Sequence, residues 1–264
     1  MTTHCFIPDV QAKPGVPIDH LKWIGRYIVE KKPDVIINSG DFWDMPSLSI
    51  YDRGTKKAEG KCYQDDIDAG ITAMNVLLDP IKKYNARAKK KYNPRKVFLI
   101  GNHEERIERH VNANPELFKK LSYNDFQLKK DKWEVHDFLK PVCIDGVHYV
   151  HYVTNPMTGK PIGGQAHTRL KNVGFSFTMG HQQVKDIAQI DLVNGETRRA
   201  LIAGACYLHH EGYKGYQGNN HWRGIIFKHE VKNGDYCLME LSLDYLCRRY
   251  EGVSLKKYKP KLFA

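Results

Sequence analysis

VFLIGNHE, residues 97–104, joins an apolar run to a group of polar side chains. The run Val97–Ile100 is typical of a buried strand, and Asn102 and His103 follow at the point where that strand should end. Ligands bind at the carboxyl ends of the strands in open α/β sheets. The stretch therefore predicts an α/β fold whose functional site includes an amide and an imidazole.

The residues before this stretch predict a β-α-β-α-β beginning. Residues 4–8 and 34–38 are short apolar strands, while residues 17–30 and 65–84 carry apolar side chains at helical spacing. The second helix has Asp65 as its candidate N-cap, and Pro80 favours a kink within it. A further helical stretch is expected from residue 104 to about residue 128.

From Trp133 onwards the sequence is mostly strand-like. Asp145-Gly146, Asn194-Gly195 and Asn233-Gly234 each separate two apolar runs, as hairpin turns do. An irregular insertion is expected around residues 154–170. These patterns predict an α/β protein with two facing sheets flanked by helices, in a single domain over residues 1–252 that is followed by a basic tail, residues 253–264.

Composition indicates a chain that can bury a substantial core, since 41% of its 264 residues are hydrophobic. The sequence has no apolar stretch of about 18 or more residues and no charged and then apolar leader, so we expect a soluble cytoplasmic protein without membrane contact. Its six cysteines are scattered without metal-finger spacing, which is typical of buried thiols in a reducing compartment.

Basic residues exceed acidic ones by 41 to 30, which gives a net charge of +11. The excess lies in three clusters, namely Lys82, Lys83, Arg87, Lys89, Lys90, Lys91, Arg95 and Lys96; Lys119, Lys120, Lys129, Lys130 and Lys132; and Arg248, Arg249, Lys256, Lys257, Lys259 and Lys261. Each cluster alone is equally well explained as a solvated surface. Together they favour a polyanionic partner, and nucleic acid above all.

Polar residues elsewhere accompany GNHE in a fixed order. They are Asp9 with Gln11, the group Gly40, Asp41 and Asp44, then His151, and finally Gly180, His181 and Gln183. The ordered set resembles the calcineurin-like metallophosphoesterase superfamily, whose pattern is DxH, GDxxD, GNHE, a lone His at a strand end, and GHxH. The resemblance implies a four-layer sandwich of two mixed β-sheets flanked by helices, and metal-dependent hydrolysis of phosphoester bonds.

The resemblance also implies a site with two divalent metal ions that share Asp41 as a bridging ligand. One ion would be held by Asp9, Gln11, Asp41 and Gln183, and the other by Asp41, Asn102, His151 and His181. His103 is not a ligand in the family, where it contacts the phosphate or protonates the leaving oxygen, and Asp44 or Asp9 would orient it.

The sequence departs from the family pattern at Gln11 and Gln183, which replace two histidines on the same ion. Amide and carboxylate oxygens suit Mn²⁺, Mg²⁺ or Ca²⁺ better than Zn²⁺. We therefore expect a manganese-preferring enzyme with one weak and one strong site, with Mg²⁺, Ni²⁺ or Zn²⁺ as other candidates. The glutamines are also consistent with a site that has lost its activity.

Two other sequence features could be mistaken for parts of such a site. His148 is an alternative to His151, but it lies on the opposite face of the same strand, and His151 follows the apolar run. Asp52-Arg53-Gly54 resembles part of the GDxVDRG motif of protein Ser/Thr phosphatases, but it lies too far along the chain from Asp41. The sequence therefore does not indicate a protein phosphatase.

Candidate substrate-binding residues lie in a loop rich in Gly, Tyr and Asn: His209, His210, Trp222 and Arg223, with His167 and Arg169 as similar candidates in the insertion. Aromatic and cationic side chains can stack bases and hold phosphates, although an ordinary hairpin loop is an equally simple explanation. The leading hypothesis is a nuclease or a DNA or RNA phosphatase. The alternatives are a phosphodiesterase for small substrates such as cyclic nucleotides, and a nucleic-acid-binding protein with an inactive metal site. The chain also resembles phosphoesterases encoded by bacteriophages, which would place it in the host cytoplasm.

Overall fold

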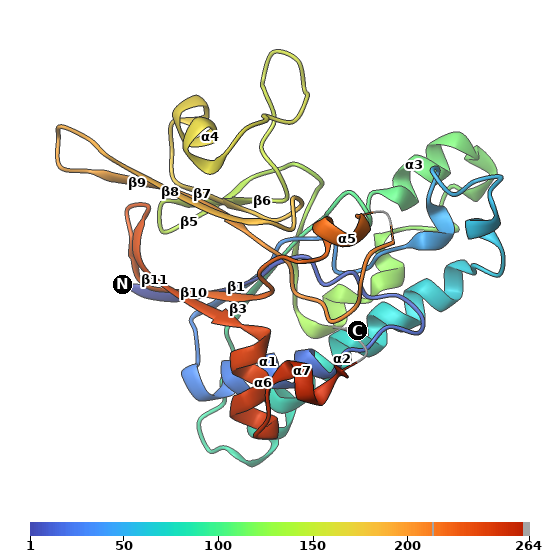
Figure 1. Ribbon diagram of the computed structural model, residues 1–264, viewed down its shortest axis with the longest axis horizontal. Helices are drawn as coiled ribbons and strands as arrows, with labels where there is room; N and C mark the ends of the chain where they lie inside the picture. Colours follow the sequence, from blue (N-terminus) through green and yellow to red (C-terminus); the bar gives the residue numbers. More distant parts are fainter. Residues whose placement is uncertain (213, 261–264) are drawn as a thin grey trace.

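Two mixed β-sheets face each other in the computed structural model, which describes residues 1–212 and 214–260 (Figure 1). The six-stranded sheet has the order β11-β10-β1-β2-β3-β4 and contains β1 (Thr2–Ile7), β2 (Val35–Asn38), β3 (Arg95–Leu99), β4 (Glu134–His136), β10 (Gly224–Lys232) and β11 (Asp235–Ser242). The five-stranded sheet has the order β5-β6-β7-β9-β8 and contains β5 (Val142–Ile144), β6 (Val147–Val150), β7 (Phe177–Met179), β8 (Lys185–Asp191) and β9 (Thr197–Ala203).

Helices cover the outer faces of both sheets (Figure 1). The six-stranded sheet is covered by α1 (Asp19–Lys31), α2 (Tyr63–Arg87), α6 (Leu243–Glu251) and α7 (Leu255–Tyr258), and the five-stranded sheet by α4 (Ala166–Val173). The remaining helices are α3 (Arg106–Ala113) and α5 (Gly215–Gly218), with 3₁₀ turns at η1 (Pro46–Leu48), η2 (Lys56–Ala58), η3 (Pro115–Leu117), η4 (Tyr123–Phe126) and η5 (Leu128–Asp131). This arrangement confirms the predicted α/β sandwich.

Alternating side chains explain why the first sheet is buried on both faces. In β1, Cys5 and Ile7 pack against the helices, whereas Phe6 packs into the space between the sheets beside Tyr149 of β6. Successive side chains of a strand point to opposite faces, so a continuous apolar run fills two core layers at once. The apolar strands of the sequence therefore build both the inner and the outer core.

Two helix boundaries differ from the sequence prediction. Helix α2 begins at Tyr63 with Cys62 at its N-cap, so Asp65 lies in the first turn and is not the cap. The stretch expected to be helical over residues 104–128 contains one regular helix, α3, followed by the 3₁₀ turns η3 and η4. Pro115 lies directly after that helix, where a residue without a backbone N–H and with a fixed φ interrupts the regular hydrogen bonding.

The end of the chain is more ordered than the expected basic tail suggests. Residues 255–258 form α7, and Tyr258 packs edge-on against Trp23 of α1 with ring centroids 5.4 Å apart. Lys261 and the residues after it lie outside the described part of the chain. No helix among the described residues is long and apolar enough to cross a membrane.

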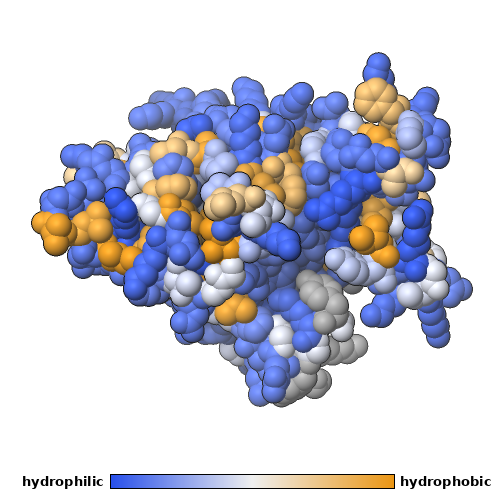
Figure 2. Space-filling model, turned by 90° about the horizontal axis from the view of Figure 1, so that it is seen from above, coloured by the Kyte–Doolittle hydropathy of each residue, from blue (hydrophilic) through white to orange (hydrophobic). Residues whose placement is uncertain are grey.

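The surface is largely hydrophilic, and hydrophobic side chains gather toward the end of the molecule formed by β8 and β9 (Figure 2). The β8–β9 hairpin exposes Ile187 and Val193 there. The parallel strands β1, β2 and β3 all end at one edge of their sheet, and β6 and β7 end nearby in the facing sheet. The loops that follow these five strands carry the polar residues of the sequence motifs.

Candidate metal centre

Sharp turns after the strands bring the motif residues together. Gln11, Asp41, His181 and Gln183 all have left-handed backbones, with φ angles of 52°, 50°, 64° and 56°. A non-glycine residue with positive φ costs free energy, and such residues concentrate at functional sites. The four side chains are therefore directed to one place at a cost in folding free energy.

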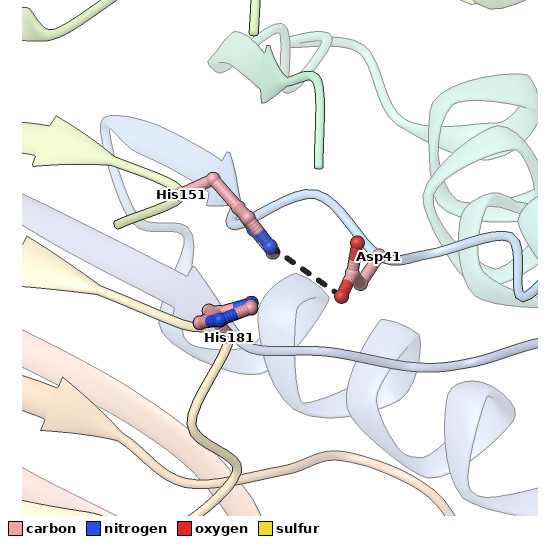
Figure 3. A group of neighbouring side chains, drawn as sticks. All are labelled: Asp41, His151 and His181. Atoms are coloured by element: carbon pink, nitrogen blue, oxygen red, sulfur yellow. Dashed lines mark ion pairs between the residues drawn. The ribbon is translucent and has the colours of Figure 1, made fainter. Parts of the chain in front are cut away.

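Asp41, His151 and His181 form a compact cluster (Figure 3). Their nearest ligand atoms all lie within 4.8 Å of one another, and His151 Nε2 is 3.4 Å from Asp41 Oδ2. Asn102 Oδ1 is 2.9 Å from His151 Nε2 and 2.7 Å from His181 Nδ1. The structure thus gathers all four residues that were expected to hold the second ion.

Electrostatics in this cluster favour an anionic Asp41. Burial alone would raise the pKa of its carboxyl group, but His103 and His151 outweigh burial and hold that pKa well below its usual range. Conversely, Asp41 outweighs burial at His151 and raises the pKa of that imidazole to about 9. A divalent cation would take over the role of the imidazolium, because ligand histidines bind metals in their neutral form.

The residues expected around the first ion leave polar atoms unpaired. Asp9 is fully buried, and its Oδ1 accepts hydrogen bonds from Ser39 Oγ and from the His181 backbone N–H, both at 3.0 Å. Asp9 Oδ2 and both amide atoms of Gln11 have no hydrogen-bond partner among the described residues. Unpaired buried polar atoms are costly, so these oxygens fit a cation that would bind them.

Gln183, the last expected ligand of this ion, is also buried at the site. Its Oε1 accepts a hydrogen bond of 2.9 Å from the Tyr207 hydroxyl, which in turn lies 3.2 Å from Lys214 Nζ. Burial, followed by the charge of Asp41, raises the pKa of Asp9 to about 6. The donor set on this side therefore consists of carboxylate and amide oxygens.

His103 and Asp44 form a hydrogen-bonded pair beside the cluster. His103 Nδ1 is 2.7 Å from Asp44 Oδ1 and 2.8 Å from the Asp44 carbonyl oxygen, so Nδ1 carries a proton, while Nε2 lies 3.4 Å from Arg106 Nη2. Burial lowers the pKa of His103, but Asp41 and Asp44 together outweigh it and raise that pKa above its ordinary value. Of the two expected orienting carboxylates, Asp44 is the one that contacts His103.

Lys13 and Glu211 extend this pair and were not anticipated from the sequence. Lys13 Nζ is 2.7 Å from Asp44 Oδ2 and 2.8 Å from both carboxylate oxygens of Glu211. Glu211 Oε1 also lies 2.5 Å from His209 Nε2. Three loops, those after β1 and β2 and the one before β10, are thereby joined at the cleft.

Glu104 holds the loop after β2 in place. Its Oε2 accepts hydrogen bonds from the backbone N–H groups of Asp41 at 2.8 Å and Gly101 at 2.9 Å, and its Oε1 accepts one from Trp43 at 2.9 Å. Burial, followed by the charge of Asp41, raises the pKa of Glu104 to about 7. The last residue of the GNHE motif thus acts on the backbone, a role that a sequence motif does not reveal.

A cleft of about 950 Å³ opens beside the metal cluster. Its lining includes Asp41, Asn102, His103 and His181 from the centre, and Lys13, Asp44, Asp52, Lys57, Lys61, Asp65, Asp66, Arg106, Glu211 and Lys214 from the walls. The volume lies at the upper end of the range typical of ligand pockets, which is roughly 300 to 1,000 Å³. The cleft therefore has room for a substrate larger than a single phosphate.

The expected substrate-binding residues His209, His210, Trp222 and Arg223 are not among the residues that line the cleft. His209 is buried against Tyr207, Arg223 donates hydrogen bonds to the carbonyl oxygens of Tyr207 and Asn219, and Trp222 packs beneath Lys185. His210 is exposed, but it is not among the lining residues of the cleft.

The other candidates from the sequence lie elsewhere. The ring of His148 packs against Phe175 and does not belong to the metal cluster. In the insertion, Arg169 is buried against Gly164 and Met179, and His167 is exposed.

Comparison with known proteins adds an independent finding. The sequence model of a family described as calcineurin-like phosphoesterase matches residues 4–232. Among solved structures, Yfce, a phosphoesterase from E. coli, is similar over 91% of this chain and 99% of its own, with 10% sequence identity and a TM-score of 0.41. No curated protein matches the sequence.

Proposed function

This chain belongs to the calcineurin-like phosphoesterase family and is therefore a metal-dependent phosphoesterase, and we propose that it hydrolyses phosphoester bonds of nucleic acid at a two-metal centre. The observation that carries the proposal is the convergence of Asp41, Asn102, His151 and His181 beside an open cleft. We propose Asp41 as the ligand shared by both ions.

The residues present fit this pair of ions. Asp41, Asn102, His151 and His181 supply oxygen and nitrogen donors for one ion, while Asp9, Gln11 and Gln183 supply oxygens for the other. Two divalent cations neutralise the charge of the phosphate and lower the pKa of a bound water. Asp9, Gln11 and Gln183 offer only oxygen donors. Because hard oxygen ligands suit Mn²⁺, we propose Mn²⁺ as the preferred metal.

His103 is proposed as the catalytic residue that moves a proton. Asp44 holds its Nδ1–H, so the imidazole presents Nε2 to the cleft and is oriented for a hydrogen bond to the phosphate or for protonation of the leaving oxygen. Arg106 supports the same loop, since its Nη1 donates a hydrogen bond of 2.7 Å to the Asp44 carbonyl oxygen. These contacts fix the geometry before substrate binds.

Hydrolysis of small phosphodiesters is the second candidate. The walls of the cleft carry acidic side chains, Asp52, Asp65 and Asp66 among them, which would repel a long polyanion. A nucleotide-sized substrate would contact fewer of them.

The proposal is tested by assaying bis-p-nitrophenyl phosphate and single-stranded DNA with Mn²⁺, Mg²⁺, Ni²⁺ and Zn²⁺, beside the Asp41→Asn and His103→Ala variants. We expect turnover led by Mn²⁺ and lost in both variants. Turnover of the small ester without any turnover of DNA would favour the second candidate. A wild type that is inert with every metal would overturn the proposed activity.

A further inference from the structure

One face of helix α3 lines a second cavity next to the cleft. Arg109 and His110 lie three and four residues after Arg106, and Ala113 lies four and three residues after them, so the four residues share one side of the helix. The cavity has a volume of about 230 Å³ and is closed on its other side by residues 46–54. That segment contributes Arg53 to the lining.

This cavity is unusually basic, and we call Arg53, Arg106, Arg109 and His110 the arginine pocket. Asp52 is the one carboxylate among its described lining residues, and it is already paired with Lys61 at 2.6 Å. Neither Arg53 nor Arg109 forms an ion pair with any residue that the structure describes, in contrast to arginines such as Arg95 and Arg249. Arg106 is partly offset by Asp44 Oδ1 at 3.8 Å, so the uncompensated positive charge of the arginine pocket lies on Arg53 and Arg109.

The arginine pocket is continuous with the metal centre. Asn102 and Arg106 line both cavities. Arg106 Nη1 lies 3.1 Å from the Met45 carbonyl oxygen, and Nη2 lies 3.4 Å from His103 Nε2, so the guanidinium lies directly beside the proposed catalytic imidazole. A substrate that reaches the metal centre can therefore extend into the arginine pocket without leaving the protein surface.

Tyr51 lies on the border between the two cavities and lines both of them. Its side chain is 85% exposed, so the ring is accessible to a ligand in either cavity. A base can stack on such a ring with a gain of about 1 to 3 kcal/mol. Tyr51 thus adjoins both the cleft of the metal centre and the arginine pocket.

From the adjoining cavities and the charge of Arg53 and Arg109 we infer that the arginine pocket binds a second phosphate of the substrate, the one next to the reacting phosphate along a nucleic-acid strand, while Tyr51, which lines both cavities, contacts the nucleoside that joins the two phosphates. The inference rests on the proposed function. Guanidinium groups bind phosphate through paired charge-assisted hydrogen bonds, which an isolated phosphodiester at the metal centre could not use. A polyphosphate offers a second phosphate as well, but it offers no base to Tyr51 at that position.

The test compares substrates that differ in the number of phosphates. Initial rates are measured for bis-p-nitrophenyl phosphate, for the dinucleotide TpT, for the trinucleotide TpTpT and for ATP, with wild type, Arg109→Gln, Arg53→Gln and the control Arg198→Gln. Arg198 lies on β9, outside both cavities, and its substitution removes the same charge. Equilibrium binding of a fluorescent oligothymidylate in EDTA at several salt concentrations provides a readout that needs no turnover.

We expect Arg109→Gln and Arg53→Gln to lower kcat/KM for TpTpT about tenfold or more and to leave bis-p-nitrophenyl phosphate within about twofold. Binding of oligothymidylate should weaken by a similar factor. The slope of the logarithm of its affinity against the logarithm of the salt concentration should become shallower by about one unit, which corresponds to one lost phosphate contact. Arg198→Gln should match wild type in every assay.

Three results would overturn the inference: equal losses on all substrates, no loss on any substrate, or a loss confined to ATP. Failure of the proposed function is seen separately, because a wild type that does not turn over bis-p-nitrophenyl phosphate can still be tested for loss of oligothymidylate affinity in the two variants. Retained affinity in both would then refute the arginine pocket as a phosphate site.

Discussion

Substitution of Gly70 by alanine should affect stability in two opposite ways, through the helix and through tertiary packing. Gly70 lies inside α2, where a change to alanine should stabilise the helix by about 1 kcal/mol. A Cβ atom built at this position would lie 1.8 Å from Trp43 Nε1 and 2.0 Å from Trp43 Cδ1. The indole and the helix backbone are therefore in direct contact, and Gly70→Ala cannot be accommodated without movement.

The indole has little room to move. Trp43 is fully buried, its ring centroid lies 4.4 Å from that of Phe126, and its Nε1 donates a hydrogen bond of 3.3 Å to the Ile67 carbonyl oxygen. Overpacking of a tight core costs about 1 to 3 kcal/mol, and loss of the hydrogen bond adds about 1 kcal/mol. After subtraction of the helix gain, we expect Gly70→Ala to destabilise the protein by about 2 kcal/mol.

Thermal unfolding and urea unfolding measure this change, with Thr72→Ala as the matched control on an exposed position of the same helix. For a chain of this size about 2 kcal/mol corresponds to a melting temperature lower by roughly 4 to 8 °C. Because Trp43 lies between Asp41 and Asp44 in the chain, Mn²⁺ affinity should fall as well. A Gly70→Ala variant as stable as wild type, or more stable, would refute the reasoning.

Three further predictions concern the site and the core. His103→Ala should lower kcat by about 10² to 10⁴ while Mn²⁺ binding, followed by calorimetry, stays unchanged; a parallel loss of metal affinity would contradict its assignment as a non-ligand. Lys13→Met should lower kcat by about tenfold or more and Lys13→Arg by less, because Lys13 holds Asp44 between His103 and Glu211. The control is Lys82→Met, which breaks an exposed ion pair with Asp131, and equal kinetics in all three variants would contradict the role of Lys13. Burial lowers the pKa of His20 to about 3. As the pH falls below 6.5, His20 is therefore protonated in the unfolded chain but stays neutral in the folded protein, so wild type loses stability. The unfolding free energy of wild type relative to His20→Gln should therefore drop by about 2 to 3 kcal/mol between pH 6.5 and pH 4.5, and a constant difference would contradict this.

The sheet and its edge could be predicted from the sequence because they depend on local patterns. Apolar runs such as Val97–Ile100 and the turn Asn233-Gly234 have the same meaning in most folds. The stretch after residue 113 was misjudged as continuous helix because its apolar side chains pack against the core from 3₁₀ turns, where helical spacing is only approximate. Pro115 ends the regular helix locally, and tertiary packing decides the conformation of the turns that follow.

The candidate metal ligands could be proposed from the sequence because they follow strands, but their supporting contacts could not. Lys13 contacts Glu211 across almost the whole chain, and Glu104 binds backbone N–H groups of a loop that is remote in sequence. Contacts of this kind depend on the register of two sheets and leave no periodic signal. The loop that leads to Trp222 and Arg223 reaches the cleft with Glu211 and Lys214, whereas Arg223 itself donates a hydrogen bond to the Tyr207 carbonyl oxygen.

The position of charge, rather than its sum, determines where a polyanion would bind. The cluster around Lys89–Lys91 precedes β3, whose amino end begins at Arg95, while the metal centre follows the carboxyl end of the same strand. Arg95 is paired with Glu134 in addition, which reduces its attraction for phosphate. Exposed charges act over about one Debye length, roughly 8 Å at physiological salt, so a cluster at the far end of a strand contributes little at the reacting phosphate. Arg53 and Arg109, which form no ion pair with any described residue, line a cavity that adjoins the proposed metal centre through Arg106, and for this reason we expect them to affect substrate choice more directly than the net charge of +11 does.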